Sequence, residues 1–247
     1  MKWITKKFTA LALVALMLFS LTGCSAFQGK NKKYAAYVTS LLDANYKGEF
    51  DTFLSMTDSD REAVTKAYND GIEHLADTLI AYYGIELVDD GTIRNQFIDL
   101  TKQIYAASKY EVKPAVKSGD TYTVEVLIYP MDILQTTYND VISYIESFNT
   151  KKNAGDFDDY EIEQYEVEFA QGIIDILTKA IPDISYLDAT STIVTIQTEN
   201  NTYSISQDDF TKLDHNLIAS VEDTSESMQP STQEATTAKN PGIDDAE

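Results

Sequence analysis

The spacing of apolar residues predicts helices through the first half of the chain. Apolar side chains recur every three or four positions, which is the period of a helix that buries one face. Ser59 lies three residues before Glu62, the spacing of a capping box, and so indicates where a long helix begins. The helices predicted from this pattern cover residues 34–46, ended by Gly48, and then 50–56, 59–83 and 93–104.

The period changes to two after residue 108, which predicts strands. The segments "KYEVKPAV" (109–116) and "TYTVEVLIY" (121–129) alternate apolar and polar positions around the turn "KSGD", as in a hairpin with one buried face. A second hairpin is predicted at 191–206, around the turn "TENNT". Between the two hairpins the helical period returns at 132–149 and 158–181.

The order of these segments indicates the fold class. Helices, hairpin, helices and hairpin predict an α+β fold in which several amphipathic helices pack on antiparallel β-hairpins. The pattern lacks the alternating strand–helix units of a parallel sheet, which disfavours the two-lobed solute-binding lipoproteins of transporters. The predicted domain covers residues 34–221, either as one unit or as two related halves that divide near residue 131.

The first 23 residues have the layout of a secretory signal peptide. Three lysines precede the apolar run "FTALALVALMLFSL", whose length of about 15 residues is below the roughly 18 to 20 that a membrane-spanning helix needs. The next residues, "LTGC", resemble the lipobox of bacterial lipoproteins. The resemblance implies that the sulfur of Cys24 receives a diacylglyceryl group with acyl chains such as palmitate, and that a peptidase cuts after Gly23.

A lipid on Cys24 would attach the protein to the extracytoplasmic face of the cell membrane. Two acyl chains are enough for stable attachment, whereas one is marginal. Because Cys24 is the only cysteine of the chain, the lipid uses its only thiol. The sequence therefore predicts a mature chain with no disulfide and no cysteine ligand for a metal.

Removal of the signal peptide changes the charge of the chain. Lys plus Arg falls from 19 to 16 against 40 acidic residues, which gives a formal charge of −24. Such a body is repelled by nucleic acid, whereas a cationic protein or small ligand is a suitable partner. Residues 24–33 are predicted to form a lipidated polar tether with three lysines, and residues 222–247 a disordered acidic tail.

Three stretches between residues 34 and 215 resemble a group of uncharacterised lipoproteins of Gram-positive, low-GC bacteria. They are "YVTSLLDANYKGEFDTFLSMT", "YNDGIE" and "YEVKPAVKSGDTYTVEVLIYPMDIL". The group has a domain of unknown function and no assigned catalytic residues. The resemblance therefore implies an envelope location and a domain boundary, and it assigns no site residue.

The folded region contains no recognisable catalytic motif. His74 and His215 do not form the H-E-x-x-H pattern of a zinc protease, and we interpret both as structural or surface histidines. The chain has no G-x-S-x-G motif and no glycine-rich phosphate loop. We therefore predict no catalytic residue, no metal ligand and no cofactor. Tyr82 and Tyr83, at a predicted helix end, are the first pair to inspect for a ligand groove.

Acidic residues gather in "GDFDDYEIEQYEVE" (155–168) and "VDDGT" (88–92). One interpretation of these segments is a calcium site, because Ca²⁺ prefers several oxygen ligands. The spacing in 155–168 departs from that of a calcium loop and suits the capped, solvated start of a helix, where negative charge opposes the macrodipole. The segment 88–92 is interpreted as a turn.

These observations predict a lipid-anchored, extracytoplasmic binding or interaction protein of the bacterial cell envelope, and not an enzyme. Its partners would be the membrane, through the lipid on Cys24, and an unidentified protein or small ligand. The alternative is an envelope hydrolase that uses a pair of carboxylates on a glycan or peptide, because two acidic residues distant in the sequence need only meet in space.

Overall fold

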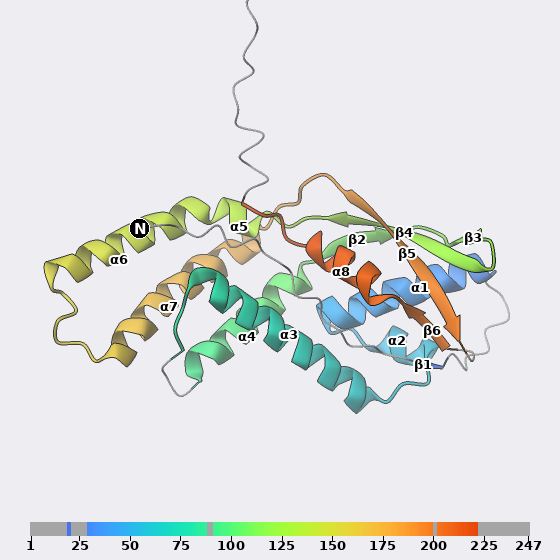
Figure 1. Ribbon diagram of the computed structural model, residues 1–247, viewed down its shortest axis with the longest axis horizontal. Coiled ribbons are helices and arrows are strands. Elements are labelled where there is room, and N and C mark those ends of the chain that lie inside the picture. The colour runs from blue at the N-terminus through green and yellow to red at the C-terminus, as the bar shows by residue number, and fades with distance from the viewer. Residues whose placement is uncertain (1–18, 21–28, 88–90, 200–201, 222–247) are drawn as a thin grey trace, which may run out of the picture.

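The computed structural model describes residues 19–20, 29–87, 91–199 and 202–221. Along these residues, helical segments alternate with the strands of one antiparallel sheet (Figure 1). The α-helices are α1 (Lys30–Leu42), α2 (Asp51–Met56), α3 (Arg61–Tyr83), α4 (Thr92–Ala106), α5 (Ile133–Thr136), α6 (Tyr138–Ala154), α7 (Ile162–Ala180) and α8 (Gln207–His215). A π-helical turn, η1 (Asp43–Lys47), follows α1, and a 3-10 turn, η2 (Ile181–Asp183), follows α7. The strands are β1 (Phe19–Ser20), β2 (Lys109–Val112), β3 (Val116–Ser118), β4 (Thr121–Tyr129), β5 (Thr190–Glu199) and β6 (Thr202–Ile205).

The strands form one sheet in the order β1-β6-β5-β4-β2, and β3 also pairs with β4. Each of these pairings is antiparallel. The two predicted hairpins therefore share a single sheet, joined where β4 lies beside β5. Their register runs from Tyr122 opposite Ile196 to Ile128 opposite Thr190. The predicted α+β class, with amphipathic helices on antiparallel strands, is confirmed.

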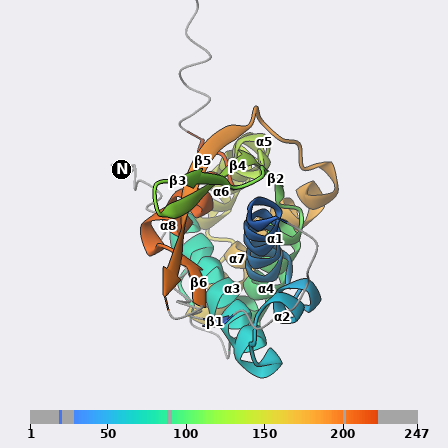
Figure 2. The same ribbon diagram turned by 90° about the vertical axis from the view of Figure 1, so that its right-hand side faces the viewer.

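One face of this sheet forms the floor of the hydrophobic core. Val124, Val126 and Val194 are fully buried, and alternation along each strand places them on the same face. In both views α1, α3 and α4 lie on one side of the sheet (Figures 1 and 2). Tyr34 of α1 packs directly on the sheet, with its ring centroid 4.6 Å from that of Tyr122.

The predicted helical stripe of α3 is confirmed, but its predicted cap is wrong. Val64 and Ile72 are fully buried in the core. The N-cap residue is Asp60, whose carboxylate accepts a hydrogen bond from the Ala63 backbone N–H at 2.9 Å. The Ser59 hydroxyl instead forms a hydrogen bond with the Thr57 hydroxyl. Both residues are good caps, and the local path of the chain after α2 decides between them.

The start of the domain differs in detail from the predicted boundaries. Helix α1 begins at Lys30, so the last four residues assigned to the tether are helical. It continues into η1, and Gly48 ends the helical stretch as predicted, with a φ of 70° that favours glycine. Strand β1, opposite Tyr203 and Thr202 of β6, lies within the predicted signal peptide. Cleavage after Gly23 would therefore leave β6 at the edge of the sheet.

Helices α6 and α7 pack as an antiparallel hairpin around aromatic side chains. Gly172 of α7 allows the ring of Tyr144 of α6 to approach the backbone of α7. The Tyr144 hydroxyl then donates hydrogen bonds to the carbonyl oxygens of Glu168 and Phe169, at 2.9 and 3.3 Å. Because these carbonyls lie within a helix, the contact fixes the position of one helix along the other.

We predict that Gly172→Ala destabilises the protein. A Cβ atom at residue 172 would lie 2.1 Å from Cζ of Tyr144, so the ring would have to leave its site. Overpacking of this kind costs about 1–3 kcal/mol in the free energy of unfolding, measurable by urea denaturation. Gly29→Ala is the matched control, because a Cβ there meets no atom within 4 Å. Equal stability of the two variants would contradict the packing described.

Candidate functional site

The predicted lipid-attachment residue, Cys24, lies outside the described residues. The structure does fix where the folded domain begins after it, because α1 starts at Lys30. The chain between Cys24 and Gly29 can span at most about 17 Å when fully extended. A lipid on Cys24 would therefore hold the first turn of α1 close to the membrane surface.

The acidic segment 155–168 forms the connection between α6 and α7 and the start of α7. Glu161 is the N-cap of α7, and its side chain and that of Gln164 form a reciprocal capping box. A capped helix start within this segment is therefore confirmed, although α7 begins at Ile162 and not at residue 158 as the periodicity predicts. Within the described part of the chain, no group of three His, Cys, Asp or Glu residues is placed to hold a metal ion. Residues 88–90 of the other acidic segment lie outside the described ranges.

The structure places the two histidines and the tyrosine pair on separate elements. His74, midway along α3, is half-buried, and its Nε2 atom makes no hydrogen bond within the described residues. His215, in the last turn of α8, is exposed. Tyr82 and Tyr83 touch edge to face, with ring centroids 4.9 Å apart. Tyr82 reaches the surface and Tyr83 packs against the core, so the two rings do not face a common groove. Burial raises the pKa of Tyr83 above its usual value.

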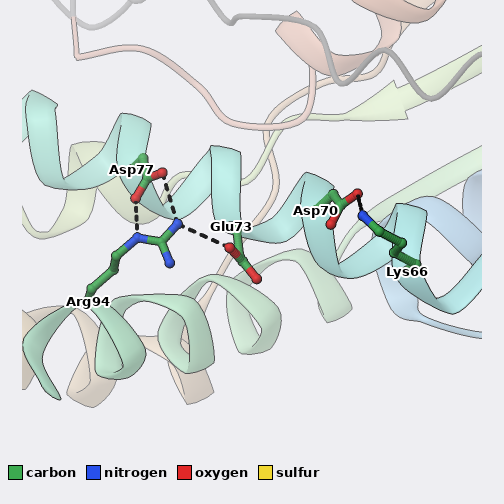
Figure 3. Close-up of polar contacts among 5 residues, drawn as sticks. All are labelled: Lys66, Asp70, Glu73, Asp77 and Arg94. Atoms are coloured by element: carbon green, nitrogen blue, oxygen red, sulfur yellow. Dashed lines mark hydrogen bonds and ion pairs between the residues drawn. The ribbon is translucent and has the colours of Figure 1, made fainter. Parts of the chain in front are cut away.

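A charged cluster that has no contiguous sequence motif joins α3 to α4 (Figure 3). Arg94 of α4 donates to Asp77 through Nε at 2.8 Å and through Nη2 at 3.0 Å, and to Glu73 through Nη2 at 3.2 Å. The hydrogen bond to Asp77 raises the pKa of Arg94, and the bond to Glu73 adds to the effect. Glu73 and Asp77 share one face of α3, which was the available sequence signal, but only the packing of α4 shows that they pair with Arg94.

The hydrogen bonds of the Arg94 guanidinium hold α4 against α3. We therefore predict that Arg94→Lys lowers the free energy of unfolding. A lysine cannot reproduce the two parallel bonds to Asp77, so the loss should be about 0.5–1 kcal/mol in urea denaturation, reduced at high salt. Lys66→Gln is the control, because the Lys66–Asp70 pair lies on one helix and both side chains are mostly exposed. If Lys66→Gln lowers the free energy of unfolding as much as Arg94→Lys does, the contacts of Arg94 have no special role in stability.

A buried cluster of tyrosine and aspartate side chains lies where η1, α4 and α8 meet. Tyr46 is fully buried, Tyr105 is 9% exposed and Asp214 is 5% exposed. Burial raises the pKa of Tyr46 most, and the nearby charge of Asp214 raises it further. The ring of Tyr46 also stacks on Phe210 of α8, with centroids 5.8 Å apart. The spacing of Phe210, Leu213 and Asp214, which is that of one helical face, was the sequence signal for a buried carboxylate.

A second tyrosine–aspartate contact extends this arrangement to the sheet. The Tyr110 hydroxyl of β2 donates to Oδ1 of Asp43, which also forms an ion pair with Lys47 at 3.0 Å. The Lys47 ammonium lies 4.4 Å from the centroid of the Tyr110 ring. Burial raises the pKa of Tyr110, and its bond to Asp43 adds to the rise. These groups have their partners inside the fold, so the arrangement holds elements together and is not suited to transferring protons to a ligand.

The raised tyrosine pKa values predict a specific loss of stability at high pH. Tyr46, Tyr105 and Tyr110 remain neutral in the folded protein above their unfolded pKa of about 10. Their contribution is therefore complete below about pH 10 and is lost as the pH rises above it, because only the unfolded chain releases the protons. Thermal melting and tyrosinate absorbance between pH 8 and 12 should show unfolding together with delayed ionisation. Ionisation of all the tyrosines near pH 10 in the folded protein would contradict this.

No protein-family model and no curated protein matches the chain. Among solved structures, its fold is similar to that of a candidate lipoprotein, ycdA, from Bacillus subtilis subsp. subtilis str. 168. The TM-score is 0.54 at 13% identity, and the match covers 76% of this chain and 56% of that one. The chain thus spans just over half the length of the matched protein, and at this identity the likeness shows the fold alone. None of the described helices has the length and apolarity needed to cross a membrane.

Proposed function

We propose that this chain is a lipid-anchored binding or interaction protein on the extracytoplasmic face of a bacterial cell membrane. The observation that carries the proposal is the segment "LTGC", which ends at Cys24, six residues before the first helix of the folded domain. A signal peptide, a lipid-accepting cysteine and a short link to a folded domain are the parts that such an anchor needs. The likeness in fold to the candidate lipoprotein ycdA supports the same class.

The connection between α6 and α7 offers a surface for a cationic partner. These two helices extend away from the start of α1, at the other end of the molecule (Figure 1). Tyr160 and Ile162, in and directly after this connection, are 42% and 67% exposed. Exposed acidic residues flank them in the sequence, at positions 156, 158, 159, 161 and 163. Apolar side chains within an acidic surface suit a partner that is both cationic and partly apolar.

The test of the anchor is Cys24→Ser. The wild-type chain, expressed in a Gram-positive host, should partition into the detergent phase after phase separation and carry the mass of a diacylglyceryl group. The serine variant should remain unlipidated and lose this partitioning, because serine has no thiol to accept the lipid. Ser25→Ala is the matched control and should behave as wild type. Equal partitioning of wild type and Cys24→Ser would contradict the proposed function.

A further inference from the structure

The lysines of this acidic protein are unevenly distributed. Residues 29–33 and 113–118 contain five lysines and no acidic residue, although the chain as a whole has 40 acidic residues against 19 basic ones. The two segments are about 80 residues apart in the sequence, yet a hydrogen bond joins them, from the Ala115 backbone N–H to the Asn31 carbonyl at 3.0 Å. The fold therefore gathers positive charge that the sequence alone leaves dispersed.

Four of these lysines share one end of the molecule. Lys30, Lys32 and Lys33 occupy the first turn of α1, which faces the viewer beside β3 in Figure 2. Lys117 of β3 lies directly opposite Tyr122 of β4, so its side chain leaves the sheet on the face where Tyr34 of α1 packs. We name Lys30, Lys32, Lys33 and Lys117 the basic end.

The other charges near this end leave the basic end with a net positive charge. Lys113 forms an ion pair with Glu111 and is not part of it. Asp120, in the turn between β3 and β4, is the acidic residue nearest in the chain to Lys117. Lys33 is half-exposed and lies 5.6 Å from the centroid of the Tyr203 ring, whereas the other three lysines are exposed.

The position of these lysines is unfavourable for the helix itself. The N-terminus of a helix carries partial positive charge and favours acidic residues, but the first turn of α1 has no acidic residue and no side-chain cap. Three lysines at such a site oppose local stability. An external anion would offset this. Val116, the neighbour of Lys117 in β3, is 63% exposed on the opposite face of that strand.

We propose that the basic end docks on anionic phospholipid headgroups and so orients the domain, with the α6–α7 hairpin directed away from the membrane. The proposal rests on the lipid anchor of the proposed function, since Cys24 is only a few residues from Lys30. The link of at most about 17 Å keeps the basic end within one to two Debye lengths of the bilayer. The rest of the body, strongly acidic, is repelled by the same surface.

The chain offers a clean reporter, because its only tryptophan, Trp3, lies in the predicted signal peptide. Val116→Trp places a probe at the basic end, with Ser118→Trp as a second probe should the first not fold, and Ile162→Trp places one at the far end. The mature lipidated protein carrying each probe is reconstituted in vesicles of phosphatidylcholine alone or with phosphatidylglycerol, with brominated acyl chains as quenchers. We expect the Val116→Trp emission to be quenched only in the anionic vesicles and Ile162→Trp in neither.

The matched variants replace four lysines by glutamine. Removal of Lys30, Lys32, Lys33 and Lys117 should abolish the quenching of Val116→Trp, because each lysine near an anionic surface contributes about fivefold to the docked population. Replacement of four exposed lysines elsewhere, at positions 66, 151, 152 and 179, changes the net charge equally and should leave the quenching in place.

The outcomes separate the two proposals. A purified chain that fails to float with neutral vesicles lacks a lipid, and this overturns the proposed function together with docking. A chain that floats but shows the same Val116→Trp quenching in neutral and anionic vesicles overturns the docking alone. Equal loss of quenching in the two sets of lysine variants also overturns it, because net charge and not the basic end would then be responsible.

Discussion

The antiparallel pairing of β4 with β5 joins the two hairpins into one sheet. It aligns Val124 with Val194 and places both in the core with no exposed surface. A slip of one residue would turn these side chains to solvent and bring polar residues such as Thr123 into the core. Because β4 and β5 are also the strands that join the two hairpins, the register of this pair determines where α1 and α8 contact the sheet.

The same pairing explains how the α6–α7 hairpin is attached. The chain leaves the sheet after β4 and returns just before β5, so the helices between them begin and end at neighbouring points. Hydrogen bonds close this junction, from Leu187 N–H to the Pro130 carbonyl and from Met131 N–H to the Leu217 carbonyl, both at 2.9 Å. The hairpin thus projects from one end of the sheet, while α1 and β3 present the basic end at the other (Figure 1). The proposed anchor at one end and the exposed acidic surface at the other would suit a protein whose proposed partner binds away from the membrane.

The periodicity predicted those features that depend on local burial. The stripe of Val64 and Ile72 in α3 and the alternation around Val124 follow directly from which faces are covered. The pairing of the two hairpins was not predictable, because strands that alternate correctly have many possible partners and registers. The choice of Asp60 over Ser59 as the cap depends on backbone angles that both residues tolerate.

The polar clusters could not be predicted from the sequence either. The ion pairs of Arg94 join two helices, and the buried Asp214 meets Tyr46 from a helix far along the chain, so neither cluster has a sequence motif. The basic end likewise includes Lys117 only because the Asn31 carbonyl and the Ala115 amide are brought together. Cys24, by contrast, belongs to a contiguous motif that the sequence alone shows. Because it lies outside the described residues, its lipidation stays a prediction from the sequence.

Native-state hydrogen exchange measures whether β4 and β5 unite both halves of the chain in one cooperative unit. The amides of β4 and β5 that hydrogen-bond across the pair should exchange only through global unfolding, with the same free energy on both strands. If the β5 amides instead exchange through an opening of clearly lower free energy than those of β4, the two halves unfold separately, and the account given for the fold is wrong.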